Sequence, residues 1–131
     1  ESFKTARLLR KKLRQKYHIA ELGVLITDSR TIPFRAGVNG VALGYAGFRG
    51  VRDYRGTRDL FGRAFKFSRT DIADGLATAA VLVMGEGSER QPLALIEDAP
   101  IEFCERMRKK ELFIDIQDDM YRPILSELSD T

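Results

Sequence analysis

Oxygen-bearing and cationic side chains carry most of the chemistry that this sequence can offer. Asp28 and Ser29 directly follow an apolar run, and Glu86 stands between two glycines. Carboxylate and hydroxyl oxygens are suitable ligands for hard cations such as Mg²⁺ or Mn²⁺. Arginines donate forked hydrogen bonds to phosphate or carboxylate oxygens, and the candidates are Arg30, Arg35, Arg55, Arg58 and Arg63. Together these residues fit a metal-assisted site for phosphoryl transfer.

Each of these residues also has a plainer explanation. Asp28 and Ser29 are typical turn residues, and Glu86 between Gly85 and Gly87 is consistent with a simple helix stop. The arginines are equally compatible with a solvated surface. Residue types and spacing alone therefore leave both interpretations open.

Other common catalytic signatures are missing. The sequence has no Walker-type phosphate loop, no dinucleotide fingerprint and no nucleophile elbow. His18 is the only histidine and Cys104 the only cysteine, which disfavours histidine–cysteine zinc sites and Ser-His-Asp triads. A lone cysteine cannot form an internal disulfide and favours a reducing compartment, so we expect a cytoplasmic protein.

The elements that must position these residues follow from the hydrophobic pattern. A helix is predicted over residues 3–17, because its apolar residues recur at steps of three and four; they are Phe3, Ala6, Leu9, Leu13 and Tyr17. Strands are predicted over residues 22–27, 39–48, 64–69 and 93–96, with residues 28–37 as a loop. Asp28 and Ser29 then lie at the end of a strand.

A second, buried helix is predicted over residues 70–84, with Thr70 or Asp71 as its cap. Its expected inward residues are Ile72, Leu76, Ala79, Ala80, Val83 and Met84. A further helix is expected in the tail, broken by Pro123. Helices and strands mix without a strand–helix–strand rhythm, which favours an α+β class with mixed or antiparallel sheets packed with helices.

Composition and charge narrow the class of partner. The chain has 131 residues, 44% hydrophobic and 31% charged, as is ordinary for one globular domain. Its apolar runs are too short to span a membrane. Residues 1–96 hold 17 basic and 9 acidic residues, whereas residues 97–131 hold 5 and 10. The basic body favours an anionic partner such as a nucleotide, a phosphorylated metabolite or nucleic acid.

The first helix carries an alternative function. Its cations, including Lys11, Lys12 and Arg14, are compatible with a non-catalytic basic binding module for nucleic acid or an acidic partner. No bulky aromatic residue lies on the basic face for base stacking. We therefore favour a packed surface helix over a nucleic-acid-binding element.

The order of several motifs resembles the coenzyme F-420 gamma-glutamyl ligase family, and most closely its branch assigned to folate metabolism. The resemblance is dense over residues 20–98 and loose in the flanks. The motifs are GVLITDSRTIPFRAG (residues 23–37), GVALGYAGF (40–48), DYRG (53–56), DLFGR (59–63), DIADGLATAAVLVMGEGSE (71–89) and PLALIED (92–98).

The resemblance implies a ligase that joins the amine of L-glutamate to a carboxylate-bearing acceptor, such as a coenzyme F-420 precursor or a folate-like compound. It implies GTP or ATP as co-substrate, Mg²⁺ or Mn²⁺, an acyl phosphate, and a homodimer. It assigns the metal to Asp28, Ser29 and Glu86, where the family commonly has Asp, Thr and Gln. It assigns phosphate or substrate contacts to Arg35 and Arg63, and the nucleotide to Met84, Gly85, Glu86, Gly87, Ser88 and Glu89.

Relatives also carry an Asp-x-Ser-Asn motif well upstream of the first helix, and nothing in these 131 residues matches it. We therefore expect residues 1–131 to form the C-terminal portion of a larger enzyme. Alone, that portion is expected to lack ligase activity, because half of the metal–nucleotide site is missing.

Overall fold

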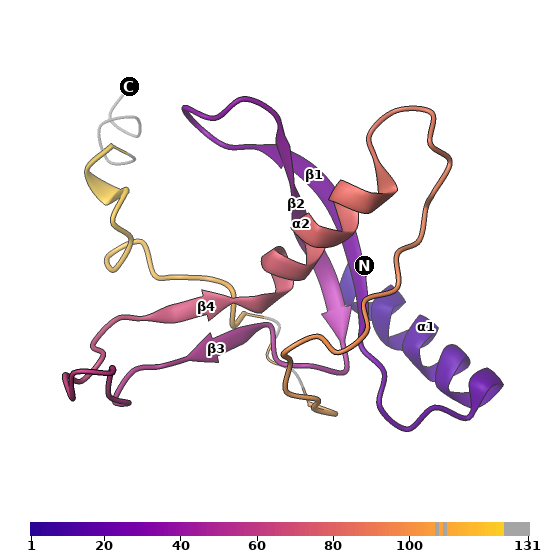
Figure 1. Ribbon diagram of the computed structural model, residues 1–131, viewed down its shortest axis with the longest axis horizontal. Helices are drawn as coiled ribbons and strands as arrows, with labels where there is room; N and C mark the ends of the chain where they lie inside the picture. Colours follow the sequence, from indigo (N-terminus) through magenta and orange to yellow (C-terminus); the bar gives the residue numbers. More distant parts are fainter. Residues whose placement is uncertain (107, 109, 125–131) are drawn as a thin grey trace.

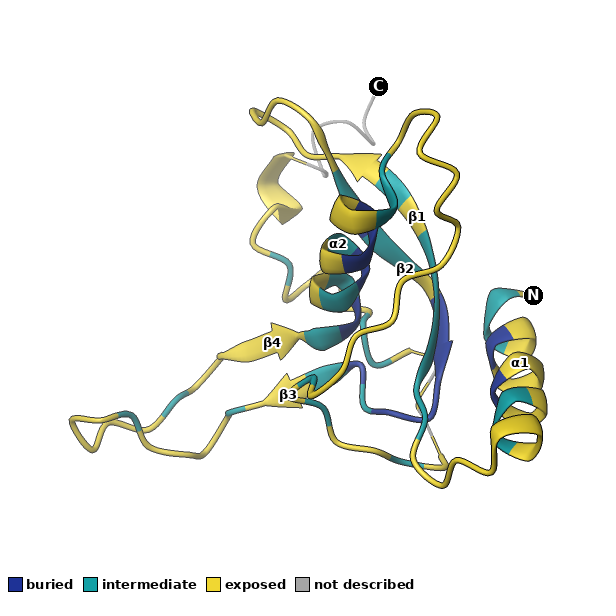
Figure 2. Ribbon diagram, turned by 45° about the vertical axis from the view of Figure 1, so that its right-hand side comes forward, coloured by how far each residue is buried: buried dark blue, intermediate teal, exposed yellow. Residues whose placement is uncertain are grey.

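A computed structural model describes residues 1–106, 108 and 110–124. Its centre is a hairpin of two antiparallel strands, β1 (Val24–Thr31) and β2 (Val38–Ala46), with helix α1 (Ser2–Tyr17) against one face and helix α2 (Ile72–Met84) against the other (Figures 1 and 2). A second antiparallel pair, β3 (Val51–Asp53) and β4 (Arg69–Asp71), precedes α2. The predicted α+β class is confirmed.

A β-bulge gives the hairpin its two packing faces. Ile26 pairs with Gly44 and Thr27 with Ala42, so Leu43 is an extra residue in β2. Side chains alternate between the faces of a strand, and an extra residue reverses that alternation. A Cβ added to Gly40 would meet α2, whereas one added to Gly44 would meet α1.

Helix α2 lies unusually close to β2. A Cβ at position 40 would lie 2.2 Å from the carbonyl oxygen of Ala77, and Thr78 Oγ1 donates to the carbonyl of Gly40 at 3.1 Å. Asp71 caps the helix by accepting the N–H of Asp74 at 2.9 Å, as predicted. Small residues on both elements therefore allow backbone-to-backbone packing.

The buried face of α2 differs from the predicted one. The buried residues are Ala73, Ala77, Ala80 and Val81. Ala80 was predicted correctly, but Ala79 is exposed and Val83 is 62% exposed. Because α2 is apolar nearly all round, its composition does not reveal which side meets the hairpin.

Tyr45 anchors the small core. Its ring lies 5.3 Å from that of Phe3 and 5.1 Å from that of Phe48, measured between centroids. Its hydroxyl donates to Glu111 Oε1 at 2.6 Å, and the N–H of Gly50 donates to the same oxygen at 2.6 Å. One carboxylate thus attaches the C-terminal segment to the core.

A second carboxylate attaches that segment to α1. Glu105 accepts hydrogen bonds from Arg10 at 2.8 and 2.9 Å and from Arg14 at 3.0 Å. Arg10 is buried, at 8% exposure, and its Nε also donates to the carbonyl of Leu22 at 2.7 Å. The hydrogen bonds from Arg10, assisted by the charge of Arg14, lower the pKa of Glu105 from 4.5 to about 2.

The chain between β3 and β4 forms an arm that extends away from the hairpin (Figures 1 and 2). Its strands continue through hydrogen bonds such as Gly56 N–H to the carbonyl of Phe65 at 2.9 Å. Several large apolar side chains on it face solvent: Leu60 at 99% exposure, Phe61 at 81% and Phe67 at 85%. Residues 64–69 were predicted as a half-buried strand, which is wrong, since β4 begins only at Arg69.

Two other sequence predictions are corrected. Residues 93–96 form no strand, and Leu93 and Leu95 are 87% and 81% exposed, because no described strand pairs with them. Helical backbone occurs at residues 122–124, and the rest of the predicted tail segment lies outside the described residues. Within the described part of the chain, no helix combines the length and apolarity needed to cross a membrane.

The close packing at Gly40 predicts a large cost for the smallest substitution. Gly40→Ala places a Cβ 2.2 Å from a backbone oxygen, so we expect about 2 kcal/mol of destabilisation. Gly75→Ala is the matched control: an added Cβ meets nothing within 4 Å, and helix propensity favours alanine by about 0.5–1 kcal/mol. Urea unfolding measures both. Equal effects would contradict the close packing.

The pairing of Glu105 predicts a pH-dependent contribution to stability. Since its folded pKa lies below its ordinary value, the ionised pair stabilises the fold above pH 4.5, and this stabilisation disappears as pH falls from 4.5 toward about 2. Glu105→Gln should lower the free energy of unfolding near neutral pH, and its difference from the parent should narrow over that range. Glu102→Gln is the control, because Glu102 meets Arg49 only at 3.6 Å. A pH-independent difference would contradict the assignment.

Candidate functional site

Two of the predicted metal ligands, far apart in the sequence, meet in the structure. Ser29 lies opposite Gly40 in the hairpin, so its side chain projects from the same face of the hairpin, the one that α2 covers. Glu86 follows the end of α2 by two residues. Ser29 Oγ donates a hydrogen bond to Glu86 Oε2 at 3.0 Å across 57 residues of sequence. The hairpin and the segment after α2 therefore share one polar site.

Asp28 belongs to the same strand, which corrects the predicted loop. Strand β1 continues through Thr31, so Asp28 and Ser29 lie within it and not after it. The extension is paired, since Asp28 faces Val41 and Ser29 faces Gly40 across the hairpin. Asp28 is exposed, and its Oδ1 accepts the N–H of Ser29 at 2.8 Å. Its carboxylate thus lies beside the backbone of Ser29.

Asp74 positions the strand and the helix relative to each other, a role that sequence reasoning missed. Its Oδ1 accepts the N–H of Ala42 at 2.8 Å, and its Oδ2 accepts from Arg30 at 3.0 Å. From its position in the sequence alone, Asp74 is only a favourable acid in the first turn of α2. Arg30, a candidate phosphate ligand, is therefore already paired with a carboxylate. The only sequence feature that could have indicated this role is the position of Asp74 near the start of the helix, where a carboxylate can also accept hydrogen bonds from outside the helix.

The segment after α2 is a tight loop. Gly85 ends the helix at φ 77°, a left-handed value that favours glycine, and its N–H donates to the carbonyl of Val81 at 2.9 Å. The carboxylate of Glu89 turns back to accept the N–H of Gly87 at 2.7 Å. Of the predicted nucleotide-binding residues, Met84 is the last residue of α2, and Gly85, Glu86, Gly87, Ser88 and Glu89 form the loop beside β1.

The two predicted catalytic arginines occupy different places. Arg35 is exposed in the loop that joins β1 to β2, at the same end of the hairpin as the loop after α2 (Figures 1 and 2). Arg63 lies on the arm, where its Nε donates to Asp59 Oδ2 at 2.9 Å. The Arg63 N–H, and then its guanidinium, hold the pKa of Asp59 below its ordinary value. The structure does not bring Arg63 to Ser29 and Glu86.

The other arginines of the arm are also bonded locally. Arg55 pairs with Asp53, and Arg58 donates to the carbonyl of Gly62 at 2.6 Å. These bonds hold the arm together, which matches the plainer explanation of those residues. Arg30 and Arg35 are therefore the predicted arginines whose segments lie at the Ser29–Glu86 end, and Arg30 is already paired with Asp74.

The donor set at this end of the hairpin suits a hard cation. Ser29 and Glu86 offer a hydroxyl and a carboxylate at one point, which are oxygen donors of the kind that Mg²⁺ and Mn²⁺ prefer. Asp28 precedes Ser29 in β1, so its carboxylate projects from the opposite face of the strand. Asp28 and Glu86 are exposed and open to a ligand. Among the described residues, no three His, Cys, Asp or Glu side chains gather closely enough to hold a metal. Any cation here would take its remaining ligands from water or substrate.

His18 and Cys104 lie outside this site, as the sequence predicted. His18 ends α1 in a left-handed conformation, at φ 55°. Cys104 is partly buried, and its N–H donates to the carbonyl of Gly47. Burial raises the pKa of its thiol, which favours the unreactive protonated form.

Comparison with known proteins identifies the family. The sequence model of the family described as F420-0:Gamma-glutamyl ligase matches residues 1–98. Proteins named coenzyme F420:L-glutamate ligase are similar to this chain. The one from Methanococcus maripaludis strain C6 is 44% identical over 102 residues, which are 78% of this chain and 41% of the relative. The one from Methanocaldococcus jannaschii is 36% identical over 118 residues, which are 90% of this chain and 47% of the relative.

A third relative, from Methanopyrus kandleri, is 45% identical over 92 residues, which are 70% of this chain and 36% of the relative. The chain thus spans less than half the length of these relatives. The family match includes β1, α2 and the loop after α2, which together build the Ser29–Glu86 site. The chain belongs to the F420-0:gamma-glutamyl ligase family.

Proposed function

We propose that this chain forms part of a ligase that adds L-glutamate in amide linkage to a carboxylate-bearing acceptor, with GTP or ATP and Mg²⁺ or Mn²⁺. The contact between Ser29 and Glu86 at 3.0 Å carries the proposal. It joins the strand assigned to the metal and the loop assigned to the nucleotide. These are the two parts that a metal–nucleotide site must bring together.

The residues of the site would divide the work. Asp28, Ser29 and Glu86 would hold the cation, which supplies screening of the repulsion between an anionic carboxylate and the nucleotide phosphates. The N–H groups of the loop over residues 84–89 would contact the nucleotide. Arg35, which is exposed at the same end of the hairpin, would bind a phosphate or the substrate carboxylate through forked hydrogen bonds.

The reaction would proceed in two displacements. An oxygen of the acceptor carboxylate attacks the γ-phosphorus, the bond to the β,γ-bridging oxygen breaks, and the nucleoside diphosphate leaves. The amine of L-glutamate then attacks the acyl carbon of the acyl phosphate. Inorganic phosphate leaves, the nitrogen loses a proton, and an amide remains. The chain's contribution is to position the groups and to compensate charge.

The names of the similar proteins favour a coenzyme F420 precursor as acceptor over a folate-like compound. Arg63 remains a proposed substrate or phosphate ligand, contributed by the arm. A homodimer would place further surface against the arm, where Leu60, Phe61 and Phe67 are exposed. We propose that the enzyme is a cytoplasmic homodimer.

The first prediction of this proposal concerns the cation. Asp28→Asn and Glu86→Gln each remove one anionic oxygen donor, so each should weaken Mn²⁺ binding about tenfold. Asp118→Asn is the control, because Asp118 is exposed in the tail and has the same charge change. Titration calorimetry with MnCl₂ measures the three variants. Equal affinities in all of them would remove the cation from this site.

The second prediction concerns the reaction. With GTP or ATP, Mg²⁺ and L-glutamate, the protein that carries this chain should convert a coenzyme F420 precursor to a product that is heavier by one glutamyl residue. Release of inorganic phosphate should require both the acceptor and glutamate, and Glu86→Gln should reduce it. Mass spectrometry and phosphate release report the two products. A product formed only from a folate-like acceptor would show that the proposed acceptor is wrong. Ligation without metal would contradict the proposed mechanism.

A further inference from the structure

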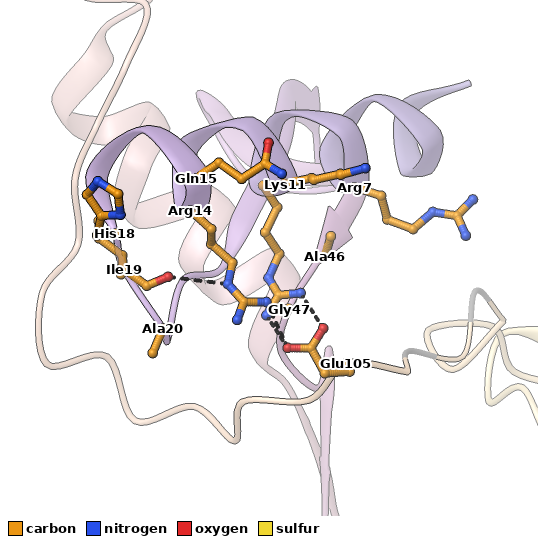
Figure 3. Close-up of a pocket in the computed structure, with 11 residues that line it drawn as sticks. Arg7, Lys11, Arg14, Gln15, His18, Ile19, Ala20, Ala46, Gly47 and Glu105 are labelled. Carbon is orange, nitrogen blue, oxygen red and sulfur yellow. Dashed lines mark hydrogen bonds and ion pairs between the residues drawn. The ribbon is translucent and has the colours of Figure 1, made fainter.

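A second polar hollow lies along α1, on the other side of the hairpin. It has a volume of about 660 Å³ and is lined by one face of α1, by the end of β2 and by Glu105 (Figure 3). Ala46 at this end of β2 is six residues from Gly40, the partner of Ser29. At 3.3 Å per residue, the two places are about 20 Å apart along the strand. The hollow is therefore separate from the Ser29–Glu86 site.

Two guanidinium groups inside the hollow bind a carboxylate of the chain itself. The guanidiniums of Arg10 and Arg14 converge on the carboxylate of Glu105 at 2.8 to 3.0 Å, as Figure 3 shows. Arg10 is held rigidly, since it is 8% exposed and its Nε is bonded to the carbonyl of Leu22. Fixed guanidiniums bind carboxylates and phosphates without first losing side-chain freedom.

Two exposed cations lie at the mouth of the hollow. Arg7 and Lys11 line it and are exposed, and neither side chain has a hydrogen bond or an ion pair within the described part of the chain. With Arg14 and His18 they follow one stripe of α1, at spacings of four, three and four residues. Arg7, Arg10, Lys11 and Arg14 thus line the hollow together with the single carboxylate of Glu105, so the positive charges exceed the negative charge there.

The shape and lining of the hollow select the class of ligand. Its volume falls within the range of small-molecule sites. No Phe, Tyr or Trp is among the described residues that line it, so it lacks the stacking platforms of single-strand nucleic-acid sites. We propose that this hollow binds a small polyanion that carries closely spaced phosphate or carboxylate groups, with Arg7 and Lys11 as its principal ligands.

The test compares two charge-matched variants of the protein that carries this chain. Arg7→Gln/Lys11→Gln removes two exposed cations that line the hollow. Lys4→Gln/Lys12→Gln removes two exposed cations of the same helix that do not line it. Tripolyphosphate is the phosphate probe, citrate the carboxylate probe, and a single-stranded oligonucleotide the polymer probe. Calorimetry is run at low and moderate salt, and circular dichroism checks that α1 is intact.

We expect tripolyphosphate or citrate to bind the parent chain, and the stronger of the two identifies the ligand's anionic group. Arg7→Gln/Lys11→Gln should weaken binding by at least about tenfold, whereas Lys4→Gln/Lys12→Gln should change it by no more than about twofold. Three results would overturn the proposal: no binding of either small anion, equal weakening in both variants, or tight binding of the oligonucleotide alone. Mn²⁺ binding at Asp28 and Glu86 is measured independently and does not depend on the outcome.

Discussion

The close approach of α2 to the hairpin at Gly40 is the constraint on which the rest of the structure depends. With no side chain between the two backbones, α2 has one position on β2, and Thr78 and Asp74 fix it with hydrogen bonds to the strand. The end of α2 then lies next to the side chain of Ser29, so that Glu86 can accept its hydrogen bond. A bulkier residue at position 40 would move the loop after α2 and separate the two parts of the candidate site.

The bulge at Leu43 extends this constraint to the whole molecule. Because it reverses the alternation of β2, the hairpin presents small residues to α2 at one end and to α1 at the other. Each helix therefore covers its own face, and each end of the hairpin acquires a different chemistry. Carboxylate and hydroxyl oxygens gather beside α2, whereas guanidinium groups gather beneath α1.

Sequence patterns predicted the α+β class, both helices and the hairpin strands, since these depend on local periodicity and capping. They failed where pairing partners decide the outcome: β1 continues through Ser29 because Gly40 pairs with it, and residues 93–96 stay irregular because nothing described pairs with them. Motif resemblance brought Ser29 and Glu86 into one prediction, although spacing alone could not show their contact. The position of Arg10 among the apolar residues of α1 indicates that its side chain is buried. No local pattern, however, identifies Glu105 as its partner.

The pairing of Arg10 with Glu105 has a kinetic consequence. It joins residues that are 95 positions apart, whereas the β1–β2 hairpin closes over a short loop. Contacts between distant residues require the closure of long loops and form slowly compared with local ones. We therefore expect the hollow beneath α1 to be completed late in folding, after the hairpin has formed. A partly folded chain would lack this hollow even where the hairpin is already native.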